Sequence, residues 1–379
     1  MNTLPKLASL LLLWWLPLAS LWSPGASAEL VANLYQQEEL VLDQGSRERR
    51  RAVEQALNQV LVRVTGNSRA PNLLALRNAI ADPAQLVDAY RYESSAETLL
   101  RDGEQLPASR LIISFSRSGI ERLLSAAGLP LWSANRPSVL VWLVRDDFDR
   151  GRQLVSLQDS SEVAATVQNI ARERGLPLVT PLLDLEDRLM INAEKIWQLD
   201  SEAIREASSR YQADAIVVGR YSQTSSGLWL AAWSLIHRDR QDVFDLENQQ
   251  ETALVAEGLA IVAEQLAAMY AIVLSNGGGA EVTLELHEVN SFPAYVAAIN
   301  YVAGLDVVRQ LRLLGVEDNR LQLRLQMQGD VDSLTNALQL DRKLIPLDAI
   351  TRGPGQGVTL PPYNGGGSAP QPLRFRWPG

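Results

Sequence analysis

The sequence predicts a mixed α/β and α+β protein made of three small modules, and three observations support this. Amphipathic helical periods alternate with short apolar runs, which is typical of chains that combine helices with sheets. Stretches rich in glycine and proline separate the periodic regions. Residues 280–347 follow the order strand, helix, two strands, helix and strand. We therefore expect a signal peptide at 1–28, an N-terminal α+β domain at 29–130, a central mixed-sheet α/β domain at 131–276, a C-terminal ferredoxin-like βαββαβ domain at 280–347 and a disordered Pro/Gly-rich tail at 351–379.

The N-terminal domain is expected to open with an extended region and an amphipathic helix. Ser46 is expected to cap this helix and Gly66 to end it, because apolar residues recur at helical spacing between them. The remaining elements expected here are a helix at 72–90, strands at 90–94 and 109–116, and a short helix at 119–127.

The central domain is predicted to be a mixed sheet with helices on its faces. Residues 138–144 form an unbroken apolar run, which is typical of a strand covered on both sides. Glu257 and Glu264 argue that the long apolar helix expected at 252–274 belongs to a soluble domain. The other expected elements are a helix ending at Gly175, a strand at 176–183, a helix at 201–211, and strands at 213–221 and 228–237 joined as a hairpin.

The third module is expected to have one wet sheet face, because leucine alternates with polar residues along 320–328. That face either meets a protein or is simply solvated. Its expected strands are 281–286, 307–314, 320–328 and 339–345, and its expected helices are 292–303 and 331–338. In the tail, residues 373–377 alternate apolar and cationic side chains. They are either part of a disordered terminus, a docking strand for a partner's sheet edge, or a weak contact with anionic lipid or cell-wall polymer.

Composition and the amino terminus predict export to the periplasm. Residues 1–28 combine the basic Lys6, an apolar stretch too short to span a bilayer and small residues at Ala26 and Ala28, which is the layout of a cleavable signal. The chain has no cysteine, hence neither a disulfide nor a lipid acceptor. Its formal charge of -9 becomes -10 when Lys6 is removed. So acidic a chain is a poor candidate for binding nucleic acid, and no transmembrane segment is expected after cleavage.

Most catalytic and cofactor chemistries lack the residues that they need. The histidines, His237 and His287, lie in different predicted domains, and neither has metal-ligand spacing around it. The sequence has no Gly-x-Ser-x-Gly elbow and no phosphate-binding loop. We therefore expect neither a metal site nor a cofactor.

Two groups of residues remain as candidate sites. Asp184 and Asp187 follow a predicted strand, where they could act as an acid and base pair on envelope glycan, although Arg188 offers a local structural partner. Trp132, Asn135 and Arg136 combine a ring, an amide and a guanidinium, which can bind a sugar or a peptide. The alternative is that the ring packs the domain junction, the amide caps a turn and the guanidinium pairs with an acid.

Several motifs carry a family resemblance. The segments GLPLW at 128–132, RYQADA at 210–215, VLVRVTG at 60–66 and YRY at 90–92 resemble an uncharacterised family of proteobacterial envelope proteins, domain-of-unknown-function family 2066. Membership implies secretion and no assigned activity. More loosely, residues 201–233 are similar in topology to envelope domains of the curli-secretion pore protein and the Tol-system beta-propeller protein, which implies assembly in the periplasm.

Two functions follow as hypotheses. The first is a non-catalytic interaction or scaffold protein of the cell envelope that binds envelope proteins through sheet edges and the domain junction. The alternative is a cell-wall ligand-binding protein or a carboxylate-based hydrolase acting on envelope glycan near Trp132, Arg136 and Asp184. A single open cleft that holds these residues together with Asp187 would favour the alternative, whereas dispersed or buried positions would count against it.

Overall fold

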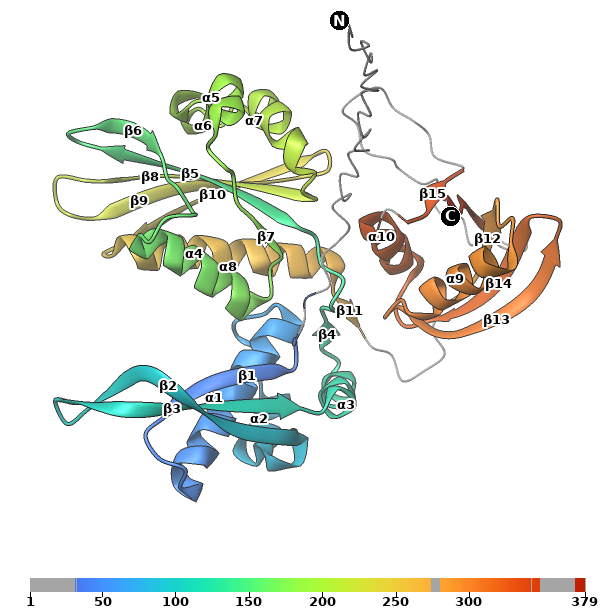
Figure 1. Ribbon diagram of the computed structural model, residues 1–379, viewed down its shortest axis with the longest axis horizontal. Helices are drawn as coiled ribbons and strands as arrows, with labels where there is room; N and C mark the ends of the chain where they lie inside the picture. The colour runs from blue at the N-terminus through green and yellow to red at the C-terminus, as the bar shows by residue number, and fades with distance from the viewer. Residues whose placement is uncertain (1–30, 32, 274–279, 342, 348–371, 379) are drawn as a thin grey trace, which may run out of the picture.

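The chain is a mixed α+β protein with several sheets, as the sequence predicts at the level of fold class. The structure is a computed structural model and describes residues 31, 33–273, 280–341, 343–347 and 372–378. Within these residues it contains ten α-helices and four sheets (Figure 1). The predicted signal peptide, the glycine joint at 276–279 and the tail residues 351–371 lie outside the described residues.

The first module packs helix α1 against a three-stranded antiparallel sheet of order β1-β3-β2. Helix α1 ends as predicted at Gly66, which adopts a left-handed φ of 68°. Its N-cap is Gly45 rather than the predicted Ser46, and no side chain caps it. The elements are β1 (Gln36–Val41), α1 (Ser46–Thr65), α2 (Arg77–Ala81), β2 (Val87–Arg101), β3 (Glu104–Phe115) and α3 (Arg117–Ala127).

One prediction for this module is wrong, and two of its predicted strands are longer than expected. The helix expected at 72–90 is broken into α2 and three short 3-10 turns, with prolines at the starts of two of these turns. The two short strands expected at 90–94 and 109–116 are instead parts of one long hairpin, β2–β3. Its turn is Asp102–Gly103, a strong hairpin signal in which both residues have positive φ.

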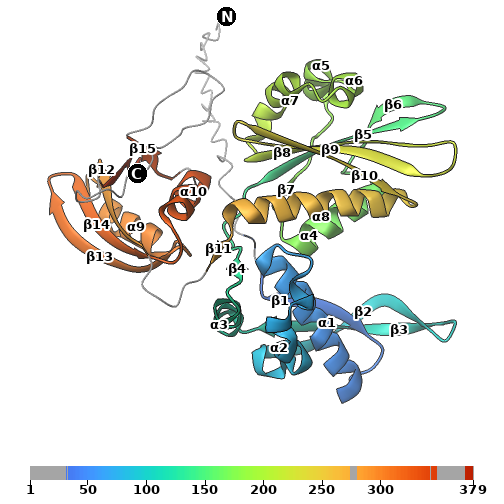
Figure 2. The ribbon, with the colours of Figure 1, turned by 180° about the vertical axis from the view of Figure 1, so that it is seen from behind.

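The central module is a six-stranded sheet with helices on both faces. Helices α4 and α8 cover one face, and α5, α6 and α7 lie over the other (Figures 1 and 2). The sheet order is β10-β9-β8-β5-β6, with β7 paired to β5. The strands are β5 (Val139–Asp147), β6 (Gly151–Leu154), β7 (Leu178–Val179), β8 (Ala215–Gln223), β9 (Trp229–His237) and β10 (Arg240–Asn248). The helices are α4 (Glu162–Arg174), α5 (Leu185–Met190), α6 (Ala193–Trp197), α7 (Ser201–Ser208) and α8 (Glu251–Tyr270).

The buried strand β5 appears where the apolar run predicts it, and α4 ends as predicted at Gly175. The strand expected at 176–183 is wrong, because only β7 forms there and the chain then enters α5. Strand β10 was not predicted, since just two of its residues, Phe244 and Leu246, are apolar and pack on the core, and charged residues surround them.

Helix α8 is, among the described residues, the one helix long and apolar enough to cross a membrane. Much of it is nevertheless inside the protein, where Leu254, Val262 and Leu266 are fully buried against the sheet and α4. Gly258 allows the closest approach, since a Cβ placed there would lie 2.1 Å from the Trp233 ring. The helix is therefore accounted for as a core element.

The third module is a five-stranded sheet of order β13-β14-β12-β16-β15 with α9 and α10. The strand expected at 339–345 is corrected, because α10 continues through Asp341 and the strand β15 is short. The C-terminal strand β16 lies between β12 and β15, and Phe375 within it is 1% exposed. A wholly disordered tail is thus excluded for residues 373–376. The elements are β12 (Glu281–His287), α9 (Phe292–Ala303), β13 (Val308–Glu317), β14 (Arg320–Met327), α10 (Val331–Asp341), β15 (Ile345–Pro346) and β16 (Leu373–Arg376).

Candidate functional site

The predicted binding residues Trp132 and Arg136 lie at the junction of the first two modules and are both 0% exposed. The junction includes a two-stranded ladder between β4 (Pro130–Leu131) and β11 (Ile272–Val273). The Trp132 amide donates to the Val64 carbonyl at the end of α1, and the Arg136 guanidinium carbon lies 4.0 Å from the centre of the Trp132 ring. Neither side chain presents a surface to a ligand.

Arg136 donates five hydrogen bonds, all to backbone carbonyl oxygens. Its Nη1 contacts Arg174 at 2.7 Å and Gly175 at 3.1 Å, while its Nη2 contacts Arg63 at 2.9 Å. The remaining two bonds go from Nε to Ser133 and from Nη2 to Trp132. The first three acceptors lie at the C-terminal ends of α4 and α1, where helices expose unpaired carbonyls.

These two helix ends explain how a buried cation is held without a carboxylate. Each helix C-terminus carries roughly half a negative charge, so two of them offset one guanidinium. Burial, and then the charge of Arg63, lower the pKa of Arg136 to about 9. Gly175 is required beside it, because a Cβ there would lie 2.6 Å from Nη1 and the residue has a φ of 65°.

Asn135 bonds to a different part of the protein from Trp132 and Arg136. Its Nδ2 donates to the Ala337 carbonyl on α10, at 3.4 Å, and thus connects the junction to the third module. The side-chain amide of Asn135 therefore contacts the third module, where the sequence predicted that it would cap a turn.

The predicted catalytic pair, Asp184 and Asp187, forms an ion-pair cluster at the start of α5. Asp184 accepts a hydrogen bond from the Asp187 amide as the helix cap, and Arg210 lies 2.8 Å from Asp184 and 3.2 Å from Asp187. Asp187 is fully buried and also accepts from the Tyr211 hydroxyl at 2.6 Å. The hydrogen bond from Arg210 lowers the pKa of Asp184 to about 2. The carboxylates thus hold a loop, with Arg210 rather than the expected Arg188 as their cation.

The two groups of candidate residues do not share an open cleft. Trp132 and Arg136 are fully buried at the junction, whereas Asp184 and Asp187 form an ion-pair cluster with Arg210. No group of three or more metal-ligating side chains occurs among the described residues.

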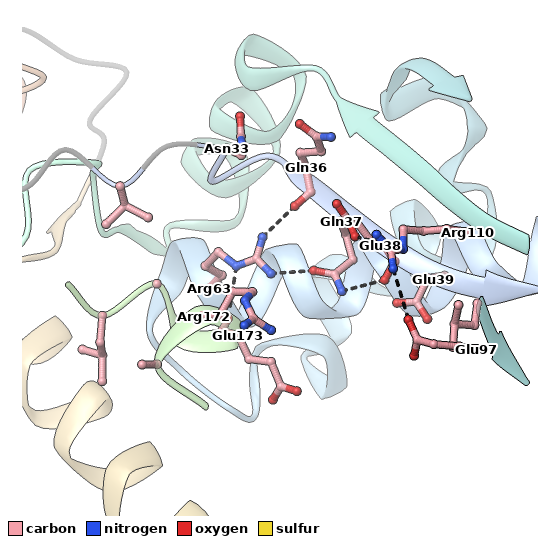
Figure 3. A pocket seen from close by; sticks show the side chains of 15 residues that line it. Asn33, Gln36, Gln37, Glu38, Glu39, Arg63, Glu97, Arg110, Arg172 and Glu173 are labelled. Carbon is pink, nitrogen blue, oxygen red and sulfur yellow. Dashed lines mark hydrogen bonds and ion pairs between the residues drawn. The ribbon is translucent and has the colours of Figure 1, made fainter. Parts of the chain in front are cut away.

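A polar groove beside strand β1 is lined by residues of the first two modules (Figure 3). Its volume is about 670 Å³. One wall is β1, and the other is the C-terminal end of α4 and the turn after it, residues 171–176. Arg63 lies at its base and donates to the carbonyls of Leu34, Gln36 and Glu173.

Strand β1 is an edge strand, and its pairing register shows which backbone groups face the groove. The amide of Phe115 donates to the Tyr35 carbonyl, so residues 35, 37, 39 and 41 bond to β3. The alternate residues 36, 38 and 40 point outward. Arg63 occupies the carbonyl of Gln36, and the Gln37 side-chain amide donates to the carbonyl of Glu38 at 3.1 Å. The amide of Glu38 and the backbone of Leu40 remain directed at the groove.

The charges of the groove are partly paired. Arg110 contacts Glu97 at 3.1 Å and Glu38 at 3.6 Å. Burial raises the pKa of Glu39, and nearby Glu173 adds to the effect. Sequence reasoning missed this site, because its two walls are more than 130 residues apart in the chain; the run of polar residues 36–39 was the one local signal.

Comparison with known proteins finds that residues 28–133 match the model of a family described as a domain of unknown function, DUF8605. The match covers the first module and ends at the buried junction residue Trp132 and its neighbour. The match is consistent with an uncharacterised family for this part of the chain. The family is DUF8605, not the domain-of-unknown-function family 2066 that the motifs resemble. No curated protein matches the chain.

Proposed function

We propose that this chain is a non-catalytic interaction or scaffold protein of the bacterial cell envelope, exported to the periplasm. The observation that carries the proposal is the groove beside the outward-facing backbone of Glu38 and Leu40. An open strand edge beside a groove suits the addition of an extended segment, in which main-chain hydrogen bonds give affinity and side chains give specificity. Export rests on the signal-like residues 1–28, and the envelope setting on the resemblance to domain-of-unknown-function family 2066.

The third module supports the same proposal. The order of its elements, β12, α9, β13, β14, α10 and β15, is that of a ferredoxin-like unit to which β16 adds a strand. The module therefore already holds an extended segment of its own chain between two of its strands, β12 and β15. We expect the envelope partners of the protein to bind as extended segments too.

The alternative, a cell-wall ligand-binding protein or a carboxylate-based hydrolase, has one observation in its favour. Glu39 and Glu173 both line the groove, and the raised pKa of Glu39 is a property of catalytic acids. Against it, the predicted residues Asp184 and Asp187 are bound to Arg210, away from the groove. Turnover of muropeptides by the purified protein that is lost in Glu39→Gln would establish the alternative.

Crosslinking at the β1 edge tests the main proposal. A photo-reactive amino acid at Glu38 should give discrete protein adducts in intact cells. Leu40→Pro should abolish them, because it removes an outward N–H without breaking a bond to β3, whereas Leu40→Ala, which keeps that N–H, should not. Adducts that persist in Leu40→Pro, or their absence together with muropeptide binding, would refute the proposal.

A further inference from the structure

Strand β10 is an exposed edge strand of the central sheet. The amide of Ala215 donates to the carbonyl of Ser138, the residue before β5. The next residue of β8, Ile216, therefore bonds to β9. The odd-numbered residues of β9 then bond to the even-numbered residues of β10. The backbone groups of four residues therefore point away from the sheet: Gln241, Val243, Asp245 and Glu247.

The side chains of these residues lie on the same face of the sheet as α5 to α7, in a part of that face that is exposed. Phe244 stacks with Trp233 on the side of α8, which places Val243, Asp245 and Glu247 on the opposite side. Val243 is 55% exposed. Leu230, which pairs with Glu247 across the strands, is 41% exposed. A hollow of about 560 Å³ lies here beside Trp197 of α6, and Asp245 and Glu247 help to line it.

The free charge at this edge is negative. Within the part of the chain that the structure describes, neither Asp245 nor Glu247 belongs to an ion pair. Arg220, the cation in the hollow, donates to the Trp197 carbonyl, and its guanidinium lies 5.6 Å from the centre of the Trp197 ring. Arg240 lies 3.6 Å from Asp242 on the same strand. A ligand that binds along this edge therefore contacts the carboxylates of Asp245 and Glu247, which lie on the same face of the strand as Val243.

The third module contains a strand whose side chains show the chemistry that would suit β10, although this strand lies between β12 and β15. Strand β16 adds in parallel to β12 with alternating apolar and cationic residues. Phe375 is buried in the core, while Arg374 lies opposite Glu285 and Arg376 is 3.9 Å from Glu288. In β16, therefore, the apolar side chains face the core and the arginines lie beside acidic residues of β12 and of the loop after it.

We infer that β10 is a docking edge for an extended segment of another protein that alternates apolar and basic residues. Strand addition would place the basic side chains beside Asp245 and Glu247. The alternate apolar side chains would then continue the core next to Phe244 and Leu246, which are only half-buried at the edge. Exposed edges of this length are association sites unless they are blocked, and acidic residues select against acidic partners.

Peptide binding to the purified protein tests this inference. The probe is a labelled nine-residue peptide alternating valine and arginine, and its twin alternates valine and glutamate; fluorescence anisotropy measures both. The basic peptide should bind and its twin should not. The double variant Asp245→Lys, Glu247→Lys should weaken binding at least about tenfold. Val243→Pro, which removes an outward N–H, should weaken it similarly, whereas Val243→Thr should not.

Three results would overturn the inference. One is equal binding of the two peptides, and another is unchanged affinity in the lysine variant. The third is a dimer in sedimentation that Val243→Pro dissolves, since the occupant would then be a second copy of the chain. Thermal unfolding of each variant confirms that it folds. Because Leu40→Pro should leave peptide binding unchanged, failure at β10 is distinguishable from failure at the β1 groove.

Discussion

Replacing Arg136 tests whether the two helix ends at the junction are held by a single guanidinium. Arg136→Met keeps an apolar stem against Trp132 but removes five hydrogen bonds to carbonyls. At about 1 kcal/mol for each bond, the loss is about 5 kcal/mol, and relief from burying the cation offsets part of it. We therefore expect the free energy of unfolding to fall by about 4 kcal/mol. Arg136→Lys keeps the charge but offers three donors without the planar fork, and should lose about 2 to 3 kcal/mol.

Urea unfolding followed by tryptophan fluorescence measures the effect, and calorimetry shows whether the first two modules still unfold together. Arg47→Met is the matched control, because Arg47 is exposed, and it should change the free energy of unfolding by less than about 0.5 kcal/mol. Two results would refute the assignment of Arg136 as the group that holds the two helix ends together. One is a free energy of unfolding for Arg136→Met within about 1 kcal/mol of that of the native protein. The other is a free energy of unfolding for Arg136→Lys equal to that of the native protein.

Three further perturbations have a defined direction. Because the hydrogen bond from Arg210 lowers the pKa of Asp184 from 3.8 to about 2, this carboxyl contributes stability above pH 3.8 that is lost as the pH falls toward 2; Asp184→Asn should therefore flatten the melting temperature against pH across that range. Burial lowers the pKa of His237 below its ordinary 6.5, so stability should fall as the pH drops below 6.5, and His237→Gln should remove that component of the melting curve. Gly258→Ala should lower stability by about 1 to 3 kcal/mol in urea unfolding, because its Cβ would overlap the Trp233 ring.

Each of these has a contrary outcome. A melting profile below pH 4 that Asp184→Asn leaves unchanged would show that the ion pair does not govern acid stability. Retention of the full pH dependence in His237→Gln would assign it to another group. Gly315→Ala is the control for Gly258→Ala, since a Cβ at Gly315 meets nothing within 4 Å. Equal effects of the two alanines would contradict the steric account.

Local signals predicted the parts of the fold that local physics determines. Gly66 and Gly175 end their helices in left-handed conformations, and the apolar run of β5 is buried on both faces. Strand β10 escaped prediction, because just two of its residues are apolar and pack on the core. The extent of β2 and β3 was missed although Asp102 and Gly103 mark their turn.

The candidate site was harder to predict, because its residues meet only through tertiary structure. Arg136 looked like a binding group, yet its partners include the carbonyls of Arg63 and Arg174, which are 73 and 38 residues away. Asp187 looked catalytic, but its partners Arg210 and Tyr211 come from a later helix. In both cases the residue type was informative about polarity and uninformative about exposure.

The junction and the β1 groove are physically one system, and this determines how the proposed function can be tested. The family match ends at residue 133, so it includes β1 but excludes the α4 end that forms the opposite wall. Arg63 bonds to both walls, through Gln36 and Glu173, and Arg136 fixes the helix that carries Arg63. A first module isolated at the family boundary would keep the β1 edge but lose the groove. Partner capture at Glu38 should therefore need both modules and should weaken in Arg136→Lys even where the protein remains folded.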